Sequence, residues 1–100
     1  MAFERLVALQ VDDPASYQRY RDGMTPILHR VGGDFGYDFE IAEVLKSQGD
    51  GPINRVFTIH FPDEATSDAF FADPEYLAVR KEHFEPAVSS VAIIATYERD

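Results

Sequence analysis

Alternating apolar and polar residues predict four strands along this chain. The strands are expected at Phe3–Val11, from Phe35 to about Lys46, at Arg55–Phe61 and at Val91–Tyr97. The segment Phe35–Ile41 alternates with a clear period of two, as strands do. The phase changes at residues 42–45, which predicts a bulge before this strand ends. Residues 48–52, with the sequence Gln-Gly-Asp-Gly-Pro, have the composition of a turn.

The first helix is predicted to follow Asp13-Pro14. The Asp13 side chain can cap the free amide groups of a first turn, and Pro14 loses nothing at the first helical position. Apolar residues then recur at spacings of three and four and form one stripe, made of Tyr17, Tyr20, Met24, Ile27, Leu28 and Val31. Gly32-Gly33 ends the helix, because glycine adopts the left-handed cap without a Cβ penalty.

Pro26 lies inside this predicted helix. Because proline has no amide hydrogen, it removes the hydrogen bond to the Asp22 carbonyl. We therefore expect a kink between Asp22 and Thr25. The kink has two interpretations: the helix bends to follow a twisted sheet, or an irregular turn lines a pocket.

The second helical region starts at Pro62-Asp63 and restarts at Asp73-Pro74, which repeats the capping chemistry of the first helix. It is expected to end at Pro86. The resulting order is βαββαβ in one domain that covers residues 1–100. This order predicts a ferredoxin-like α+β sandwich, a four-stranded antiparallel sheet with helices on one face.

Both faces of the predicted sheet are apolar. In the first strand, Val7 and Leu9 alternate with Leu6 and Ala8, and the third and fourth strands show the same property. Soluble monomers rarely expose an apolar patch of several hundred Å². We therefore expect a homodimer that packs sheet against sheet, with the acidic pair Asp38 and Glu40 of the second strand near the rim.

Composition narrows the classes of partner. The chain has 18 acidic and 9 basic residues, and its net charge of −9 is spread over both halves. A chain of this sign repels phosphate backbones and anionic lipids, so we expect neither nucleic-acid nor membrane binding. No apolar stretch reaches the length of a membrane span, and the first residues do not have the pattern of a signal peptide. With no cysteine, these features favour a cytoplasmic protein.

Several short motifs together resemble a known family. They are Asp13-Pro14 followed by Tyr17 and Tyr20, Gly32-Gly33 followed by Phe35, Phe61-Pro62, and Asp73-Pro74-Glu75-Tyr76. In this combination the chain resembles the family called domain of unknown function 1330, within the dimeric α+β barrel superfamily. The resemblance implies a ferredoxin-like protomer that pairs through its sheet, and it implies no established reaction.

The chain departs from this family at two places. Members typically carry an arginine directly after the paired glycines and an Arg-Gly-Gly a few residues later. Here the matching positions hold Asp34 and Asp38-Phe39-Glu40. Because the local charge is reversed, an anion-binding role of those arginines is not carried over to this chain.

Few residues of this sequence are suited to catalysis or to the binding of a metal or ligand. The three histidines, His29, His60 and His83, have no metal-ligand spacing, and the chain contains none of the common nucleophile, phosphate-loop or dinucleotide motifs. We expect no metal and no cofactor. A small pocket against the sheet is expected to draw on His60, whose unperturbed pKa lies near neutrality, and on tyrosines that combine an apolar ring with a polar tip. The candidate tyrosines are Tyr17, Tyr20 and Tyr97.

Two classes of function remain open. The first is a small homodimeric protein that binds an apolar or aromatic molecule between sheet and helices. The second is a cofactor-independent enzyme, similar to the monooxygenases and isomerases of the superfamily, and it rests on analogy of fold alone. A solvent-open pocket lined by His60 and tyrosines would favour the enzyme, whereas a filled core with His60 bonded to backbone would favour the binding or structural protein.

Overall fold

One antiparallel sheet organises the chain. A computed structural model describes residues 2–99. In chain order its elements are β1 (Ala2–Val11), α1 (Pro14–Arg30), β2 (Asp34–Glu40), β3 (Arg55–Phe61), α2 (Glu64–Ala72), α3 (Pro74–Val79), the π-helical turn η1 (Arg80–Phe84) and β4 (Val88–Arg99). The strands lie in the order β2-β3-β1-β4, and every neighbouring pair is antiparallel. This arrangement confirms the predicted ferredoxin-like α+β fold.

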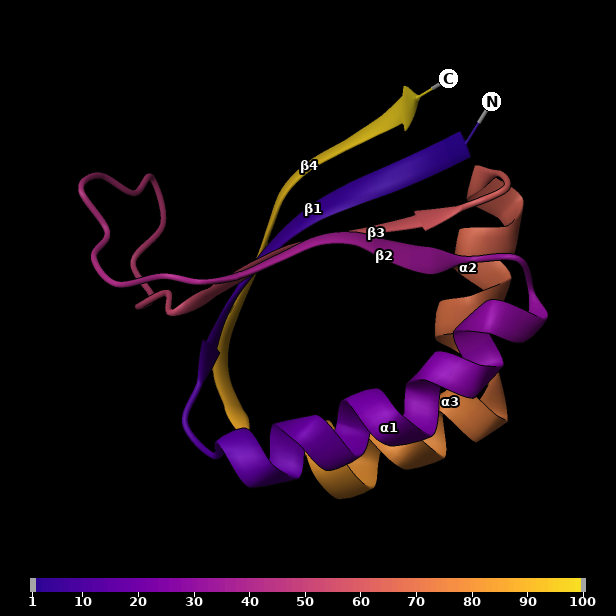
Figure 1. Cartoon of the computed structure of the whole chain (residues 1–100), viewed down its shortest axis with the longest axis horizontal. Coiled ribbons are helices and arrows are strands. Elements are labelled where there is room, and N and C mark those ends of the chain that lie inside the picture. Colours follow the sequence, from indigo (N-terminus) through magenta and orange to yellow (C-terminus); the bar gives the residue numbers. More distant parts are fainter. Residues whose placement is uncertain (1, 100) are drawn as a thin grey trace.

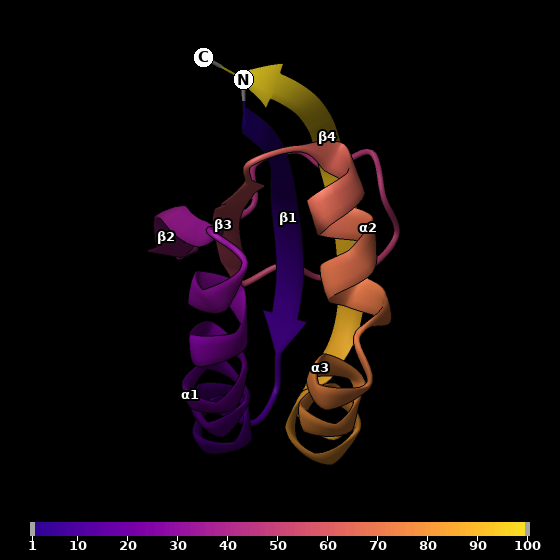
Figure 2. The ribbon, with the colours of Figure 1, turned by 90° about the vertical axis from the view of Figure 1, so that its right-hand side faces the viewer.

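All helices lie on one side of the curved sheet (Figure 1). Helix α1 lies on the side of β2 and β3, and α2 and α3 lie on the side of β4 (Figure 2). The side chains of β1 and β3 that face the helices belong to the buried core, which includes Val7, Leu9, Phe57, Ile59 and Phe61. Because side chains alternate along a strand, Leu6, Ala8, Val56 and Thr58 face the opposite, helix-free side.

The helix boundaries follow the predicted caps. The Asp13 carboxylate accepts a hydrogen bond of 3.1 Å from the amide of Ser16, and Asp63 accepts one of 2.7 Å from Thr66. After α1, Gly32 has a φ of 82°, in the left-handed region that glycine adopts readily. Capping chemistry therefore places both helical regions where the sequence predicted them.

The second strand differs from its prediction. It ends at Glu40 rather than near Lys46, and its bulge lies between Phe35 and Asp38 rather than at 42–45. At the bulge, the amide of Tyr37 donates to the Thr58 hydroxyl at 2.8 Å. A Cβ on Gly36 would lie 2.5 Å from that hydroxyl oxygen, so the close approach requires glycine. The predicted bulge was wrong because the sequence pattern does not reveal this cross-strand bond.

Two further features, the length of β4 and the course of α1, differ from the sequence predictions. Strand β4 runs over Val88–Arg99, longer than the predicted Val91–Tyr97, because residues at both of its ends pair with β1. Helix α1 continues through Pro26 as one helix to Arg30. The Thr25 hydroxyl, next to Pro26, donates at 2.6 Å to the carbonyl of Arg21, one helical turn earlier in the chain. Of the two interpretations of Pro26, the irregular turn is therefore not observed.

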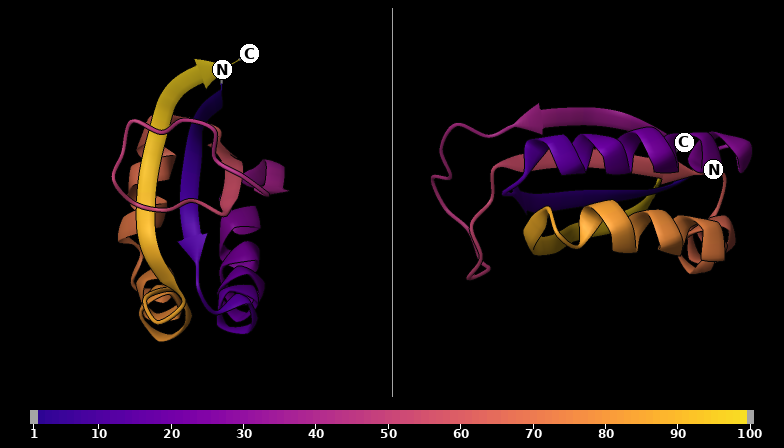
Figure 3. Two further views of the ribbon diagram at one scale, coloured as in Figure 1. Left: turned by 90° about the vertical axis from the view of Figure 1, so that its left-hand side faces the viewer. Right: turned by 90° about the horizontal axis from the view of Figure 1, so that it is seen from below.

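Residues 41–54 form a loop between β2 and β3. The loop passes in front of β1 and β4 on the helix-free side (Figure 3). It is joined to β1 through Asn54, whose backbone amide donates to the Leu9 carbonyl at 2.9 Å. Leu45 in this loop is 90% exposed. No helix within residues 2–99 is long and apolar enough to cross a membrane.

Candidate functional site

A cavity of about 190 Å³ lies between the sheet and the helices. Its walls are mainly apolar side chains, of which Val7, Leu9, Phe57 and Ile59 come from the sheet and Met24 and Phe84 from the helical layer. The edge strand β4 contributes Val91 and Ile93, which are 50% and 53% exposed. The cavity therefore opens to solvent beside β4 and closes toward the core.

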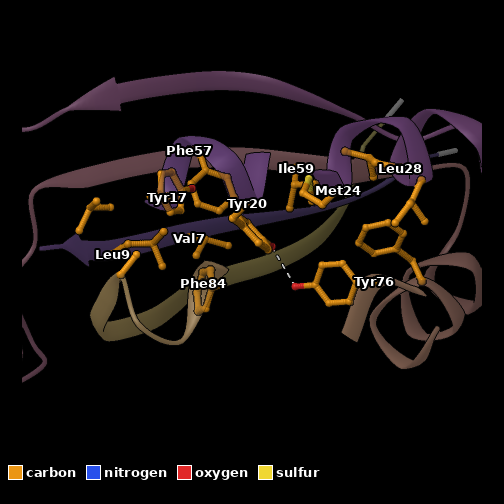
Figure 4. Packing of buried hydrophobic residues seen from close by; sticks show 14 of the residues in the cluster. Val7, Leu9, Tyr17, Tyr20, Met24, Leu28, Phe57, Ile59, Tyr76 and Phe84 are labelled. Carbon is orange, nitrogen blue, oxygen red and sulfur yellow. Dashed lines mark hydrogen bonds between the residues drawn. The ribbon is translucent and has the colours of Figure 1, made fainter. Parts of the chain in front are cut away.

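Two tyrosine hydroxyls meet in the cavity wall. Tyr20 of α1 and Tyr76 of α3 point toward each other (Figure 4), and their hydroxyl oxygens are 2.9 Å apart. Burial raises the pKa of Tyr20 well above its ordinary value. Burial also raises the pKa of Tyr76, although the hydrogen bond with Tyr20 and the nearby Arg80 and Arg5 act in the opposite direction. Both phenols are therefore neutral hydrogen-bonding groups near pH 7.

Arg21 is a cavity-lining arginine with a full set of partners. Its Nε donates to the Tyr17 hydroxyl at 2.8 Å, and its two terminal nitrogens donate to the Asp38 carboxylate at 3.3 and 3.4 Å. Arg55 also donates to Asp38, with two bonds of 2.8 Å. The acidic substitution at position 38 is thus neutralised by two arginines that approach from α1 and β3.

The other two lining arginines lack such partners. Arg5 of β1 and Arg80 of η1 line the cavity. The Nε atom of each is buried and has no hydrogen-bond partner within residues 2–99. Each guanidinium instead stacks over an aromatic ring, with its Cζ 4.4 Å from the Phe71 centroid for Arg5 and 5.0 Å from the Phe84 centroid for Arg80. The polar groups of this cavity are therefore cationic or neutral.

The structure brings together only part of the site expected from the sequence. Tyr20 lines the cavity, and Tyr17 lies beside it with its ring centroid 5.7 Å from that of Tyr20. His60 lies between the core residues Ile59 and Phe61 of β3, so its side chain is on the helix-free face. Tyr97 is on the same face, where its hydroxyl donates to Glu4. His60 and Tyr97 are therefore separated from the cavity by the sheet.

Sequence reasoning missed the arginines, although their positions carry a signal. Arg5 is in phase with Val7 and Leu9 on the face of β1 that turns toward the helices. Arg80 lies four residues from Tyr76 and four from Phe84. A charged residue that shares the apolar phase of an element is unusual, because it places a guanidinium among core side chains. That phase marks both residues as candidates.

The Asp38 cluster predicts a pH-dependent stability. Burial acts to raise the pKa of Asp38, but Arg55 and Arg21 outweigh it and hold the pKa below its ordinary value of 3.8. The ionised form therefore stabilises the fold above the unfolded pKa, and this contribution is lost as the pH falls through the folded pKa. Asp38→Asn is expected to lower the free energy of unfolding by about 1–3 kcal/mol at pH 7, and by progressively less below pH 4.

Chemical denaturation of both proteins between pH 7 and pH 2 measures this difference. Asp68→Asn on the exposed surface of α2 is the matched control and should change stability little at any pH. A difference between wild type and Asp38→Asn that stays constant below pH 4 would contradict the assignment of the ion pairs.

Fold and cavity together define a class of protein: a ferredoxin-like α+β domain with an internal, arginine-containing cavity under its sheet. The chain belongs to the family named Domain of unknown function (DUF1330), whose family model matches residues 5–97. The resemblance inferred from the short motifs is thereby confirmed.

Solved structures of low sequence identity share the fold. A protein of unknown function from Rhodopseudomonas palustris superposes with a TM-score of 0.81 at 19% identity, and the match covers 98% of this chain and 82% of that one. A dimeric ferredoxin-like protein of unknown function from Jannaschia sp. gives 0.60 at 14% identity, with 99% and 100% covered. SnoaB, a cofactor-independent oxygenase from Streptomyces nogalater, gives 0.57 at 14% identity, with 99% and 91% covered. No curated protein matches this sequence at a significant level.

Proposed function

We propose that this protein is a small homodimeric binding protein that takes up a small apolar or aromatic molecule in the cavity between sheet and helices. The cavity carries the proposal: it encloses about 190 Å³ and joins apolar walls to a few polar groups. Ligand sites are commonly built in this way. Apolar protein cavities of about 150 Å³ can hold a benzene molecule, so this one has room for a single substituted ring.

The proposed dimer uses the helix-free face of the sheet. Exposed aromatic residues gather there on β2, where Tyr37 is 67% and Phe39 52% exposed and their rings stack with centroids 5.8 Å apart. Leu6 and Val56 of the inner strands lie half-buried on the same face. A second copy can cover this face with an identical one, and such a two-fold pair closes without further growth. The Jannaschia protein, described as dimeric, supports the dimeric state.

A cofactor-independent enzyme is the second candidate, and the SnoaB fold similarity supports it. The cavity favours binding over proton abstraction. Within residues 2–99, its walls contain no carboxylate and no histidine that could accept a proton.

We further propose that the protein acts in the cytoplasm, with a second copy and a small molecule as its partners and with no nucleic acid or membrane. The net charge of −9 supports the absence of polyanionic partners.

Blocking the cavity mouth tests the binding function. Ile93 lines the mouth and is half exposed, so Ile93→Trp can fill the opening without disturbing the core. We expect the variant to weaken the binding of phenylacetate or phenylacetamide, the two one-ring probes, by about tenfold or more. Isothermal titration calorimetry measures the affinity. Leu77→Trp is the control, because Leu77 is 43% exposed on α3 and does not line the cavity.

The control should bind the probes like the wild-type protein. If neither probe binds wild type, or if Ile93→Trp binds both as tightly as wild type does, the cavity is not the binding site and the proposal fails.

A further inference from the structure

We propose that the ligand of this cavity is a carboxylate, with an apolar or aromatic body against the sheet and its carboxylate group held by Arg5 and Arg80 beside the hydroxyls of Tyr20 and Tyr76. This inference rests on the proposed function, because it requires that the cavity binds a small molecule. It adds the chemical class of the ligand and the residues that recognise it.

The three arginines that line the cavity differ in their partners. Arg21 has a carboxylate partner in Asp38, at 3.3 Å. Arg5 and Arg80 form no ion pair within residues 2–99, and their Nε atoms are buried without a hydrogen-bond partner. The chain has 18 acidic residues, twice its number of basic ones. Two unpaired guanidiniums in such a chain leave a local positive charge that an anion can neutralise.

Both guanidiniums are held in place without carboxylates. Arg5 stacks over Phe71 and Arg80 over Phe84, with 4.4 and 5.0 Å from Cζ to the ring centroids. Stacking uses the face of the guanidinium and leaves the N–H groups at its edge free to donate. The π-helical turn closes with a bond of 3.0 Å from the Glu85 amide to the Arg80 carbonyl, and such turns occur often at functional sites.

The two arginines converge on one place. Arg5 stacks over Phe71, whose ring centroid lies 5.4 Å from that of Tyr76, and Arg80 follows Tyr76 by one helical turn, directly after α3. The fields of both guanidiniums accordingly act to lower the pKa of Tyr76, which burial raises. The Tyr76 hydroxyl is 2.9 Å from that of Tyr20. A carboxylate at this place can accept charge-assisted bonds from two guanidiniums and lies within reach of the phenol pair.

The remaining wall selects the body of the ligand. Phe57, Ile59 and Met24 offer apolar surface, and no lysine lines the cavity within residues 2–99. A planar carboxylate matches the planar fork of a guanidinium and carries one negative charge. A phosphate group carries up to two charges and three acceptor oxygens, which need more donors than this small apolar cavity offers. The combination favours a monocarboxylate that is otherwise apolar.

The test compares three one-ring probes by isothermal titration calorimetry at pH 7: phenylacetate, its neutral isostere phenylacetamide, and benzylphosphonate. We expect phenylacetate to bind wild type about tenfold or more tightly than phenylacetamide. Equal affinity for these two overturns the carboxylate inference but leaves the binding function intact. Failure of both to bind overturns the binding function itself. Tighter binding of benzylphosphonate than of phenylacetate also overturns the carboxylate class.

Substitution of each arginine tests whether Arg5 and Arg80 bind the carboxylate group of the ligand. Arg80→Met and Arg5→Met keep an unbranched apolar stem, and each should reduce phenylacetate affinity about tenfold while phenylacetamide affinity changes little. The control is Arg30→Met, which removes an exposed arginine that pairs with Glu75 at 3.1 Å. Because the buried Arg80 Nε has no hydrogen-bond partner and methionine can still pack on Phe84, Arg80→Met should keep the melting temperature of wild type or raise it. Unchanged phenylacetate affinity in both Arg80→Met and Arg5→Met would overturn the assignment.

Discussion

Replacing Val56 by glutamate is expected to convert the proposed dimer into folded monomers. Val56 lies on the inner strand β3 between Ala8 and Phe39, on the helix-free face of the sheet. A second sheet packed on this face would bury the new carboxylate without a cationic partner. Burial of an unpaired charge costs about 3 kcal/mol or more, which corresponds to a roughly hundredfold increase in Kd.

The protomer itself should tolerate this change, because Val56 is half-buried and the glutamate can reach solvent in a monomer. Light scattering across a concentration series measures the mass. Leu77→Glu, on the helical side of the molecule, adds the same charge and should leave the dimer intact. A Val56→Glu protein that remains as dimeric as Leu77→Glu would place the interface elsewhere.

Truncation of Leu28 is expected to give the largest loss of protomer stability. Leu28 is fully buried in α1, and a Cβ on Gly33 would lie 2.5 Å from its Cδ1 atom, so the side chain packs directly against the backbone after the helix. Leu28→Ala removes these contacts and leaves a cavity. Comparable substitutions lower the free energy of unfolding by about 3–5 kcal/mol.

Urea denaturation of Leu28→Ala beside Leu45→Ala separates burial from residue type. Leu45 is 90% exposed in the loop between β2 and β3, so its truncation should change stability by less than about 0.5 kcal/mol. Similar losses in the two variants would mean that α1 does not pack against the sheet as described.

The fold could be predicted largely from local signals. Asp13 and Asp73 cap helices where the sequence predicted them. Alternation identified β1 and β3 because every second residue in the middle of each strand belongs to the buried core. The bulge of β2 could not be predicted in this way. It forms at the bond between the Tyr37 amide and Thr58, two residues far apart in sequence that a local pattern does not connect.

The site was harder to predict because alternation separates two faces but does not say which face the helices cover. His60 and Tyr97 have suitable chemistry, yet they lie on the helix-free side of the sheet. Tyr20 lines the cavity because it belongs to the apolar stripe of α1 that faces the core. Arg5 and Arg80 were overlooked because arginine is usually a surface residue, and only the cavity reveals that both line it.

If the space between sheet and helices binds a small molecule, the methyl group of Met24 should report the binding directly. Met24 is buried and lines the cavity, and the chain has only two methionines. A protein with labelled methionine methyl groups therefore gives a simple NMR spectrum in which Met24→Leu assigns the signal. We expect phenylacetate or phenylacetamide to shift the Met24 signal saturably in wild type and not in Ile93→Trp. A Met24 signal that neither probe moves at saturating concentration would mean that the cavity does not bind these molecules.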